Sequence, residues 1–234
     1  MSDIKYYELM DFYHVLNRGV DKRKVFLEDI DYIRFIHDMY EFNDKNSKNG
    51  LSSQRFSLKL DVRHQVLRKR EKPKRELLVK IHCFALMPNH YHLLLSPVIE
   101  NGIALFMKKL NAGYTKYFNA KHDRVGTLWQ GGYKSVPIKT DAHFNFIPYY
   151  IHFNPLDLSA PEWRVQCPAK PSAALAFLEH YRWSSHRDYL GVPNFASVTD
   201  RNFFGEVIGT GKQYAKNAVH TLKGFESEES LTLE

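Results

Sequence analysis

The stretch that most constrains the fold is residues 81–95, with the sequence IHCFALMPNHYHLLL. Pro88 and Asn89, both turn-forming residues, separate two apolar runs, so the pattern predicts two antiparallel strands with a tight connection. Side chains alternate between the two faces of a strand, which places His90 and His92 side by side on one face. Neutral imidazole is a common metal ligand, but this spacing indicates a metal site only if a third ligand and a nucleophile come from elsewhere.

The length and composition are those of a folded protein. A chain of 234 residues fits one domain with extensions, or two small domains. Hydrophobic residues make up 44% and aromatic residues 14%, which argues against disorder. No apolar run approaches the roughly 18 residues of a membrane span, and we expect no signal peptide. The two cysteines, Cys83 and Cys167, suit a reducing compartment, so we predict a cytoplasmic, nucleoid-associated protein.

The positive charge is concentrated before residue 199. The net charge is +7, and residues 1–198 carry 29 Lys and Arg against 20 Asp and Glu, which favours an anionic partner such as nucleic acid. Residues 54–80 hold ten Lys and Arg against three acids. This segment is either a solvated insertion or a basic arm that follows phosphates. The second interpretation makes Arg68, Lys69 and Arg70 DNA-binding residues.

The remaining periodicity predicts alternating strands and helices. Residues 11–18 are expected to form a strand, and residues 27–42 a helix before a polar loop. His14 in that strand could face the metal, but we expect it to be an ordinary strand residue. A helix over residues 102–122 has a basic side, and a strand over residues 128–138 is interrupted by glycines. The cationic side chains expected to bind DNA in these two elements are Lys108, Lys109, Lys116 and Lys134.

The second half of the chain is mainly helical by the same criteria. Asp141 is predicted to cap a helix over residues 141–153, which Asn154 and Pro155 stop. A short helix over residues 171–181 and an amphipathic helix over residues 203–222 follow, before an acidic tail. We divide the chain into a main domain, residues 1–190, and a helical extension with the tail, residues 191–234.

The helix over residues 141–153 supplies what the two histidines lack. Tyr150 and Asn154 lie one turn apart on one helix face, so a phenol nucleophile and an amide oxygen can meet His90 and His92. A divalent metal held by the two imidazoles and Asn154 would polarise a phosphodiester while the phenolate of Tyr150 attacks phosphorus. Mg²⁺ prefers oxygen ligands, and Mn²⁺ accepts two histidines as well.

Other side chains compete for these roles. Tyr114 and Tyr117 lie on a basic helix, where core packing or base stacking explains them better than catalysis. Tyr149 is adjacent to Tyr150 but about 100° round the helix, away from Asn154. His152, two residues after Tyr150, is expected to point away from the metal.

Several segments together resemble a known family. MPNHYHLLL resembles the His–hydrophobic–His signature of single-tyrosine HUH transposases, which include the IS200-like proteins. The segments that follow this family's order are YHVLNRGVDKRKVF, YTKYFNAKHDRVGTLWQGGYKS, YIHFNP and WSSHRDYLG, and the last is similar to the REP-associated tyrosine transposases. The resemblance covers residues 10–190 approximately, and the insertion at about 44–80 is longer than the family leads us to expect.

The resemblance implies a fold, a reaction and a set of residues. The fold would be α+β, an antiparallel sheet flanked by helices in a ferredoxin-like order. The activity would be metal-dependent cleavage and rejoining of single-stranded DNA, in hairpin or REP-like sequences, through a 5′-phosphotyrosine. His90, His92 and Asn154 would bind Mg²⁺ or Mn²⁺, and Tyr150 would be the nucleophile. A homodimer is left open.

Two other functional classes are weighed against this one. The first is a domesticated, non-catalytic nucleic-acid-binding protein derived from a transposase, which would keep the basic surface and lose strand transfer. The second is a zinc hydrolase, but no carboxylate base lies near the two histidines in the sequence.

Overall fold

The computed structural model describes residues 11–47 and 75–224. Its centre is an antiparallel four-stranded sheet in the order β2-β3-β1-β4. The strands are β1 (Tyr13–Arg18), β2 (Val79–Met87), β3 (His90–Pro97) and β4 (Lys134–Pro137). Helix α2 (Asp29–Phe42) connects β1 to β2, and α4 (Gly102–Lys121) connects β3 to β4. This is the βαββαβ order of a ferredoxin-like domain, so the predicted α+β fold is confirmed.

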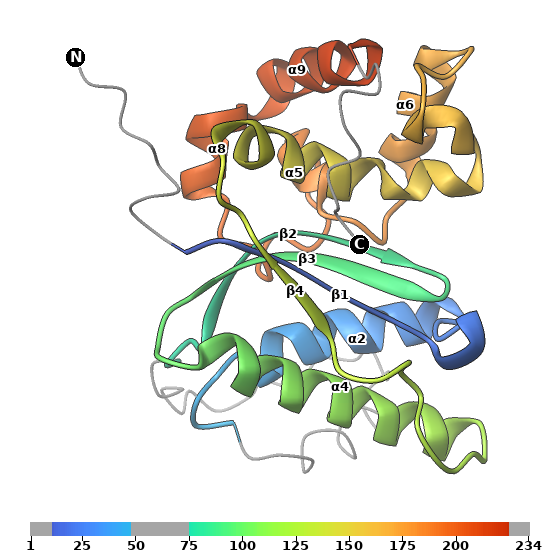
Figure 1. Ribbon diagram of the computed structural model, residues 1–234, viewed down its shortest axis with the longest axis vertical. Coiled ribbons are helices and arrows are strands. Elements are labelled where there is room, and N and C mark those ends of the chain that lie inside the picture. The colour runs from blue at the N-terminus through green and yellow to red at the C-terminus, as the bar shows by residue number, and fades with distance from the viewer. Residues whose placement is uncertain (1–10, 48–74, 225–234) are drawn as a thin grey trace, which may run out of the picture.

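Helices α2 and α4 cover one face of the sheet (Figure 1). α2 follows the short 3₁₀ helix η1 (Val20–Lys22) and begins with a capping box between Glu28 and Asp31. The buried residues of α4 recur at helical spacing and pack into one core with α2 and the odd-numbered residues of β3. Those α4 residues are Phe106, Met107, Leu110, Tyr114 and Phe118.

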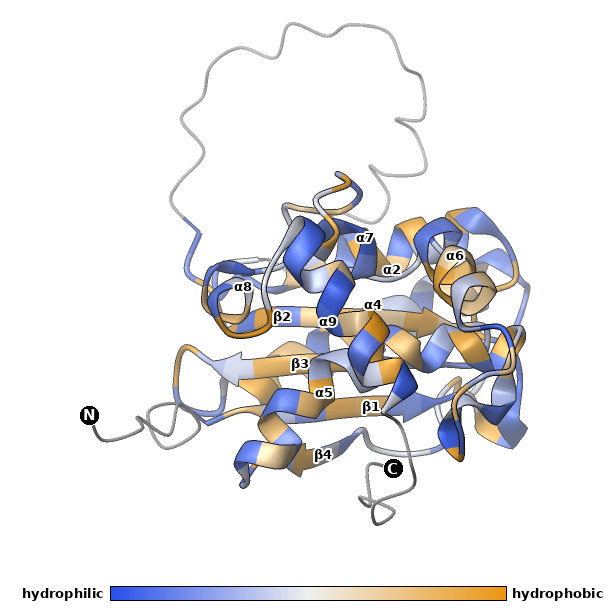
Figure 2. Cartoon of the chain, turned by 90° about the horizontal axis from the view of Figure 1, so that it is seen from above, coloured by the Kyte–Doolittle hydropathy of each residue, from blue (hydrophilic) through white to orange (hydrophobic). Residues whose placement is uncertain are grey.

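The rest of the chain covers the opposite face. Helix α5 (Asp141–Phe153) lies on β2 and β3 and runs into the 3₁₀ helix η2 (Asn154–Leu158). The elements that follow are η3 (Pro161–Arg164), α6 (Pro171–His180), α7 (His186–Tyr189), α8 (Asn202–Ile208) and α9 (Gly211–Lys223). In Figure 2, β1 and β3 carry mostly hydrophobic residues, whereas α9 carries both kinds because only one of its sides is buried.

Three elements differ from their predicted limits. The strand expected over residues 128–138 is regular only in β4: Gly131, with φ +119°, interrupts it, and Trp129 forms an isolated bridge with Gly19 before the interruption. The helix expected over residues 203–222 is two helices, α8 and α9, separated at Gly209 with φ +83°. The cap of α5 is Thr140, whose hydroxyl accepts from the backbone N–H of His143 at 3.2 Å, and Asp141 lies in the first turn.

The segment after α6 protects the open edge of the sheet. The backbone N–H of Leu86 donates to Trp183 O at 2.8 Å, and that of Ser185 donates to Phe84 O at 3.0 Å. α8 and α9 then add Phe204 and Tyr214 to the same apolar core as α5. Over the described ranges, no helix combines the length and apolar character needed to cross a membrane.

Candidate active site

The pairing of β1 with β3 brings two histidines together under α5. His92 lies opposite Leu16, and His14 lies opposite Leu94, so the two imidazoles are diagonal neighbours on one face. Nε2 of His14 and Nδ1 of His92 are 2.8 Å apart, and their rings stack with centroids at 5.0 Å. Both side chains are fully buried. The prediction that His14 is an ordinary strand residue is therefore wrong, because the strand register places it against His92.

Tyr150, on α5, packs against both imidazoles. Its ring meets both imidazoles edge-on, with centroids 5.9 Å from His14 and 6.0 Å from His92. Only 5% of Tyr150 is exposed. The described structure therefore brings the phenol next to His92, as the sequence predicted. We refer to His14, His90, His92 and Tyr150 as the His–Tyr cluster.

His90 forms the outer side of the cluster. It begins β3 directly after the Pro88–Asn89 turn, and its Nδ1 lies 2.6 Å from Oδ1 of Asn89. Because an amide oxygen can only accept, Nδ1 carries the proton and Nε2 carries the lone pair. The ring of His90 is 5.0 Å from that of His92, and the side chain is half-buried. The turn thus fixes both the orientation and the tautomer of His90.

Arg164, in η3, contacts both polar side chains of the α5 face that the sequence analysis singled out, Tyr150 and Asn154. Nη1 of Arg164 donates to the hydroxyl of Tyr150 at 2.9 Å, and Nη2 donates to Oδ1 of Asn154 at 2.9 Å. The Asp157 carboxylate accepts from Nε at 2.9 Å and from Nη2 at 2.8 Å, so it holds the guanidinium by two bonds. Trp163 lies beneath the guanidinium, 4.8 Å from Cζ to the ring centroid. We refer to these contacts as the Arg164 bridge.

The electrostatic field of the site favours neutral imidazole and charged guanidinium. Burial is the main cause that lowers the pKa of His92 well below its ordinary value, and the electrostatic influence of His90, His14, Arg164 and Arg18 adds to it. Burial also acts to lower the pKa of Arg164, but the hydrogen bonds with Asp157 and Tyr150 outweigh it and raise the pKa. His92 is therefore a neutral base at physiological pH, and Arg164 is a cation.

The side chains fit part of a metal site. Nε2 of His92 is buried and has no hydrogen-bond partner among the described residues, as expected of a nitrogen that binds a metal. Oδ1 of Asn154 already accepts from Arg164, although an amide oxygen has a second lone pair. Within residues 11–47 and 75–224, no three His, Cys, Asp or Glu side chains are arranged to hold a metal ion. The protein-derived donors would therefore be two imidazoles and one amide.

The three competing tyrosines have other partners. Tyr114 donates to the carbonyl of Val25 at 2.6 Å and Tyr117 donates to Asp31 at 3.0 Å, both on the α2 and α4 side of the sheet. Tyr149 stacks on Tyr214 on the far side of α5, and burial raises its pKa to about 12. None of the three contacts His90 or His92 in the described structure.

The predicted DNA-binding side chains are spread over several parts of the chain. Lys108 and Lys116 are exposed on α4, across the sheet from Tyr150, and Lys134 is exposed on β4. Lys109 instead donates to the carbonyl of Asp44 at 2.8 Å and so holds the loop after α2. Arg68, Lys69 and Arg70 lie outside the described residues.

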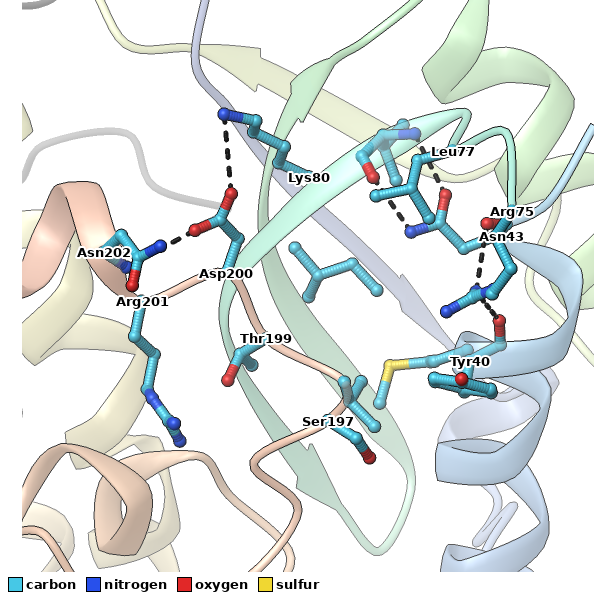
Figure 3. Close-up of a pocket in the computed structure, with 14 residues that line it drawn as sticks. Tyr40, Asn43, Arg75, Leu77, Lys80, Ser197, Thr199, Asp200, Arg201 and Asn202 are labelled. Atoms are coloured by element: carbon cyan, nitrogen blue, oxygen red, sulfur yellow. Dashed lines mark hydrogen bonds and ion pairs between the residues drawn. The ribbon is translucent and has the colours of Figure 1, made fainter.

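A cavity of about 350 Å³ lies between the end of α2, β2 and residues 197–202 (Figure 3). Its charged groups are already engaged: Lys80 pairs with Asp200 at 3.4 Å, and Arg75 donates to the carbonyls of Tyr40 and Asn43. None of the predicted site residues lines this cavity. It is therefore separate from the His–Tyr cluster.

The sequence reasoning missed Arg164 and Asp157. They lie in a proline-punctuated stretch whose pattern predicts no regular element, and their contacts with Tyr150 depend on how η2 and η3 fold back. One local signal was available: Asp157 and Arg164 closely follow the Asn154-Pro155 stop, where a charged pair can reach the end of α5.

A family model matches the part of the chain that contains the His90–His92 motif. Residues 52–154 match a family model described as "Transposase IS200 like". This match contains His90, His92, Tyr150 and Asn154, and excludes Arg164. No curated protein matches the chain. A solved structure described as "Structure of the REP associates tyrosine transposase bound to a REP hairpin" is similar at 11% identity and a TM-score of 0.44, over 82% of this chain and 87% of that one. The family match confirms the resemblance predicted from the motifs over residues 52–154.

Proposed function

We propose that this protein cuts and rejoins single-stranded DNA through a covalent 5′-phosphotyrosine on Tyr150. The observation that carries this proposal is the contact of the Tyr150 phenol with His92, inside a buried cluster that also receives Arg164. A phenol is a weak nucleophile unless its environment favours the phenolate. The family match over residues 52–154 supports the same reaction class.

The reaction is a transesterification at phosphorus. Oη of Tyr150 forms a bond to phosphorus while the bond from phosphorus to the 3′ oxygen breaks. The phenolic proton passes to solvent, and the departing 3′ oxygen takes up a proton. The attack of a free 3′ hydroxyl on the phosphotyrosine reverses these steps and rejoins the DNA. The chain's part is to hold the phenol in a fixed direction, which the packing between His14 and His92 provides.

His90, His92 and Asn154 would hold the divalent metal, Mg²⁺ or Mn²⁺. When bound, such an ion acts as a Lewis acid on a phosphate oxygen. His14 prepares His92 for this role: if Nδ1 of His92 donates to Nε2 of His14, the lone pair of Nε2 in His92 is left for the metal. Asn89 does the same for His90.

Single-stranded DNA, with a hairpin or REP-like sequence, is the proposed partner. Lys108, Lys116 and Lys134 are exposed and can reach phosphates outside the cleaved bond. The hairpin preference and the assembly into one or two chains rest on the motif resemblance.

The test is a cleavage assay on single-stranded DNA hairpins with Mn²⁺. Wild type is expected to form a DNA adduct that survives denaturing electrophoresis, and mass spectrometry should locate it on Tyr150. An adduct on Tyr114 or Tyr117 would overturn the assignment of the nucleophile.

A non-catalytic nucleic-acid-binding protein is the second candidate. The observation that favours it is that Oδ1 of Asn154 is engaged by Arg164. The same assay separates the two functions, because this candidate binds the hairpin and forms no adduct under any metal condition.

A further inference from the structure

We propose that Arg164 is a further catalytic residue, which binds the phosphate being cut. This inference rests on the proposed function, and it assigns a role to a residue outside the segment that matches the family model. Nη1 of Arg164 lies 2.9 Å from Oη of Tyr150, the atom that would bond to phosphorus. A phosphate that reaches this oxygen therefore brings its own oxygens within hydrogen-bonding reach of the guanidinium.

The surroundings of Arg164 are those of a fixed anion-binding group. The two hydrogen bonds that the guanidinium donates to Asp157, together with its contact with the Trp163 ring, hold its plane. Asp157 is itself held, because the indole N–H of Trp163 donates to its Oδ1 at 2.7 Å. A guanidinium fixed in this way can stabilise charge that develops on a phosphate without first reorganising.

Access to the cluster also points to Arg164. His14, His92 and Asn154 are fully buried, and Tyr150 nearly so, whereas the Arg164 side chain is 31% exposed. His90 is the other partly exposed member. A phosphate approaching from solvent meets these two side chains before the phenol. Arg18, which pairs with His90 across the strands, adds a second positive charge near His92.

The test compares Arg164→Met with Arg182→Met. Arg182 is a matched control, since its guanidinium also stacks on a tryptophan, 4.7 Å from Trp183, but on the segment that covers β2. With saturating hairpin DNA, Arg164→Met should slow adduct formation about 100-fold or more, the usual effect of removing one transition-state donor. Arg182→Met should keep the wild-type rate. Equal rates for all three proteins would overturn the proposal.

A neutral phosphate distinguishes binding of the phosphate from a structural role. At the mapped cleavage site, a methylphosphonate replaces one charged oxygen with a methyl group. If Arg164 acts on that charge, wild type and Arg164→Met should cut this substrate at rates within about threefold, because the two changes remove the same interaction. If the full difference persists, Arg164 only supports Tyr150 or the fold, and the proposal fails. Should Arg164→Met not fold, Arg164→Lys keeps the charge without the planar fork and should lose part of the rate.

A separate measurement keeps this inference distinct from the proposed function. In Tyr150→Phe protein, inorganic phosphate should shift the Nε–H NMR signal of Arg164 in a saturable way, with the signal identified by its loss in Arg164→Met. If wild type forms no adduct but this shift occurs, the proposed function fails and the phosphate site stands. If adducts form on Tyr150 and phosphate leaves the signal unchanged, only the role of Arg164 is overturned.

Discussion

The two faces of the sheet are packed in different ways. On the α2 and α4 face, the core is largely aromatic and aliphatic, and its buried charges include Arg34, which pairs with Asp38 at 2.9 Å. On the α5 face, five histidines are buried with their pKa lowered, first of all by burial: His82, His92, His143, His152 and His186. Within the described residues, the same sheet thus supports a core without buried histidines on one side and a histidine-rich interior on the other.

This difference shows what makes a tyrosine a candidate nucleophile. Tyr114 and Tyr150 are both buried on helices that pack against the sheet. Tyr114 donates to a carbonyl, and burial raises its pKa far above the ordinary value. Tyr150 instead accepts from a guanidinium, which favours the phenolate form. Burial alone therefore does not mark the site; the charge of the hydrogen-bond partner does.

The largest effect expected is for Tyr150→Phe, compared with Tyr114→Phe. Tyr150→Phe should abolish the covalent adduct and leave the Kd for a DNA hairpin nearly unchanged. Tyr114→Phe should keep the adduct and lower the free energy of unfolding by about 1–3 kcal/mol, because the Val25 carbonyl loses its donor. Gel assays measure the adduct and the Kd for DNA, and urea unfolding measures the free energy of unfolding. Adduct formation by Tyr150→Phe would show that the nucleophile is not the tyrosine of the α5 face.

The next effect concerns the metal. His92→Ala and His90→Ala should each reduce cleavage on the order of 100-fold or more, and excess chelator should do the same to wild type. The fold should survive, which circular dichroism checks. Mn²⁺ binding, followed by electron paramagnetic resonance, should weaken in both variants. Full cleavage in excess chelator would rule out a metal-dependent mechanism.

A smaller loss is expected for His14, because it acts through His92. His14→Ala should lower Mn²⁺ affinity about 10–100-fold, the usual cost of losing the partner that orients a ligand. His14→Gln, which can still accept from Nδ1 of His92, should recover part of that loss. If both variants bind Mn²⁺ like wild type, His14 is only packed against His92.

The sequence predicted the elements and most of the site, for physical reasons that are local. Strand alternation placed His90 and His92 on one face, and helical spacing placed Tyr150 one turn before Asn154. The spacing of side chains along a strand or helix is a property of a short segment, so it can be read from the sequence without knowledge of the tertiary structure. The predicted strand and the predicted helix are interrupted at Gly131 and Gly209, and the local signal there is the residue type, because glycine adopts a positive φ without strain.

The parts that could not be predicted depend on long-range register. His14 contacts His92 across 78 residues of sequence, and the contact exists only in the register that sets Leu16 against His92. A shift by one residue would move His14 to the other face. Arg164 reaches Tyr150 only because η2 and η3 turn back on α5. Neither contact produces a repeating pattern of residues that could be recognised in the sequence.

The two faces should also differ in their response to acid. Burial lowers the pKa of His82 to about 4 and that of His186 to about 3. Between these values and the unfolded value of about 6.5, the unfolded chain binds protons that the folded chain does not. Stability is therefore fully present above about pH 6.5 and falls as the pH drops, by up to about 1.4 kcal/mol per pH unit for each histidine.

Urea unfolding at pH 7.5 and pH 5 measures this loss, and hydrogen exchange locates it. Amides of α5 and α9 should lose protection before those of α2 and α4. His186→Asn should reduce the pH dependence, whereas the control His180→Asn, at an exposed position, should not. Equal loss of protection on both faces would show that the histidines do not set the acid response.

The smallest effect is expected for DNA affinity, and it tests whether the face opposite Tyr150 takes part in binding. Each phosphate contact on single-stranded DNA contributes about 0.7 to the slope of log affinity against log salt. Replacing Lys108 and Lys116 with Ala should therefore reduce that slope by up to about 1.4 if α4 contacts DNA. Replacing Arg68, Lys69 and Arg70 should reduce it by up to about 2.1, with hairpin preference kept, since shape and base contacts would come from the folded domain. Lys109→Ala is the control, because this lysine anchors the loop after α2 and should affect stability more than the slope. An unchanged slope for the α4 pair would confine the DNA path to the α5 side and the β4 edge, and an unchanged slope for the arginine and lysine triplet would make the insertion a solvated segment.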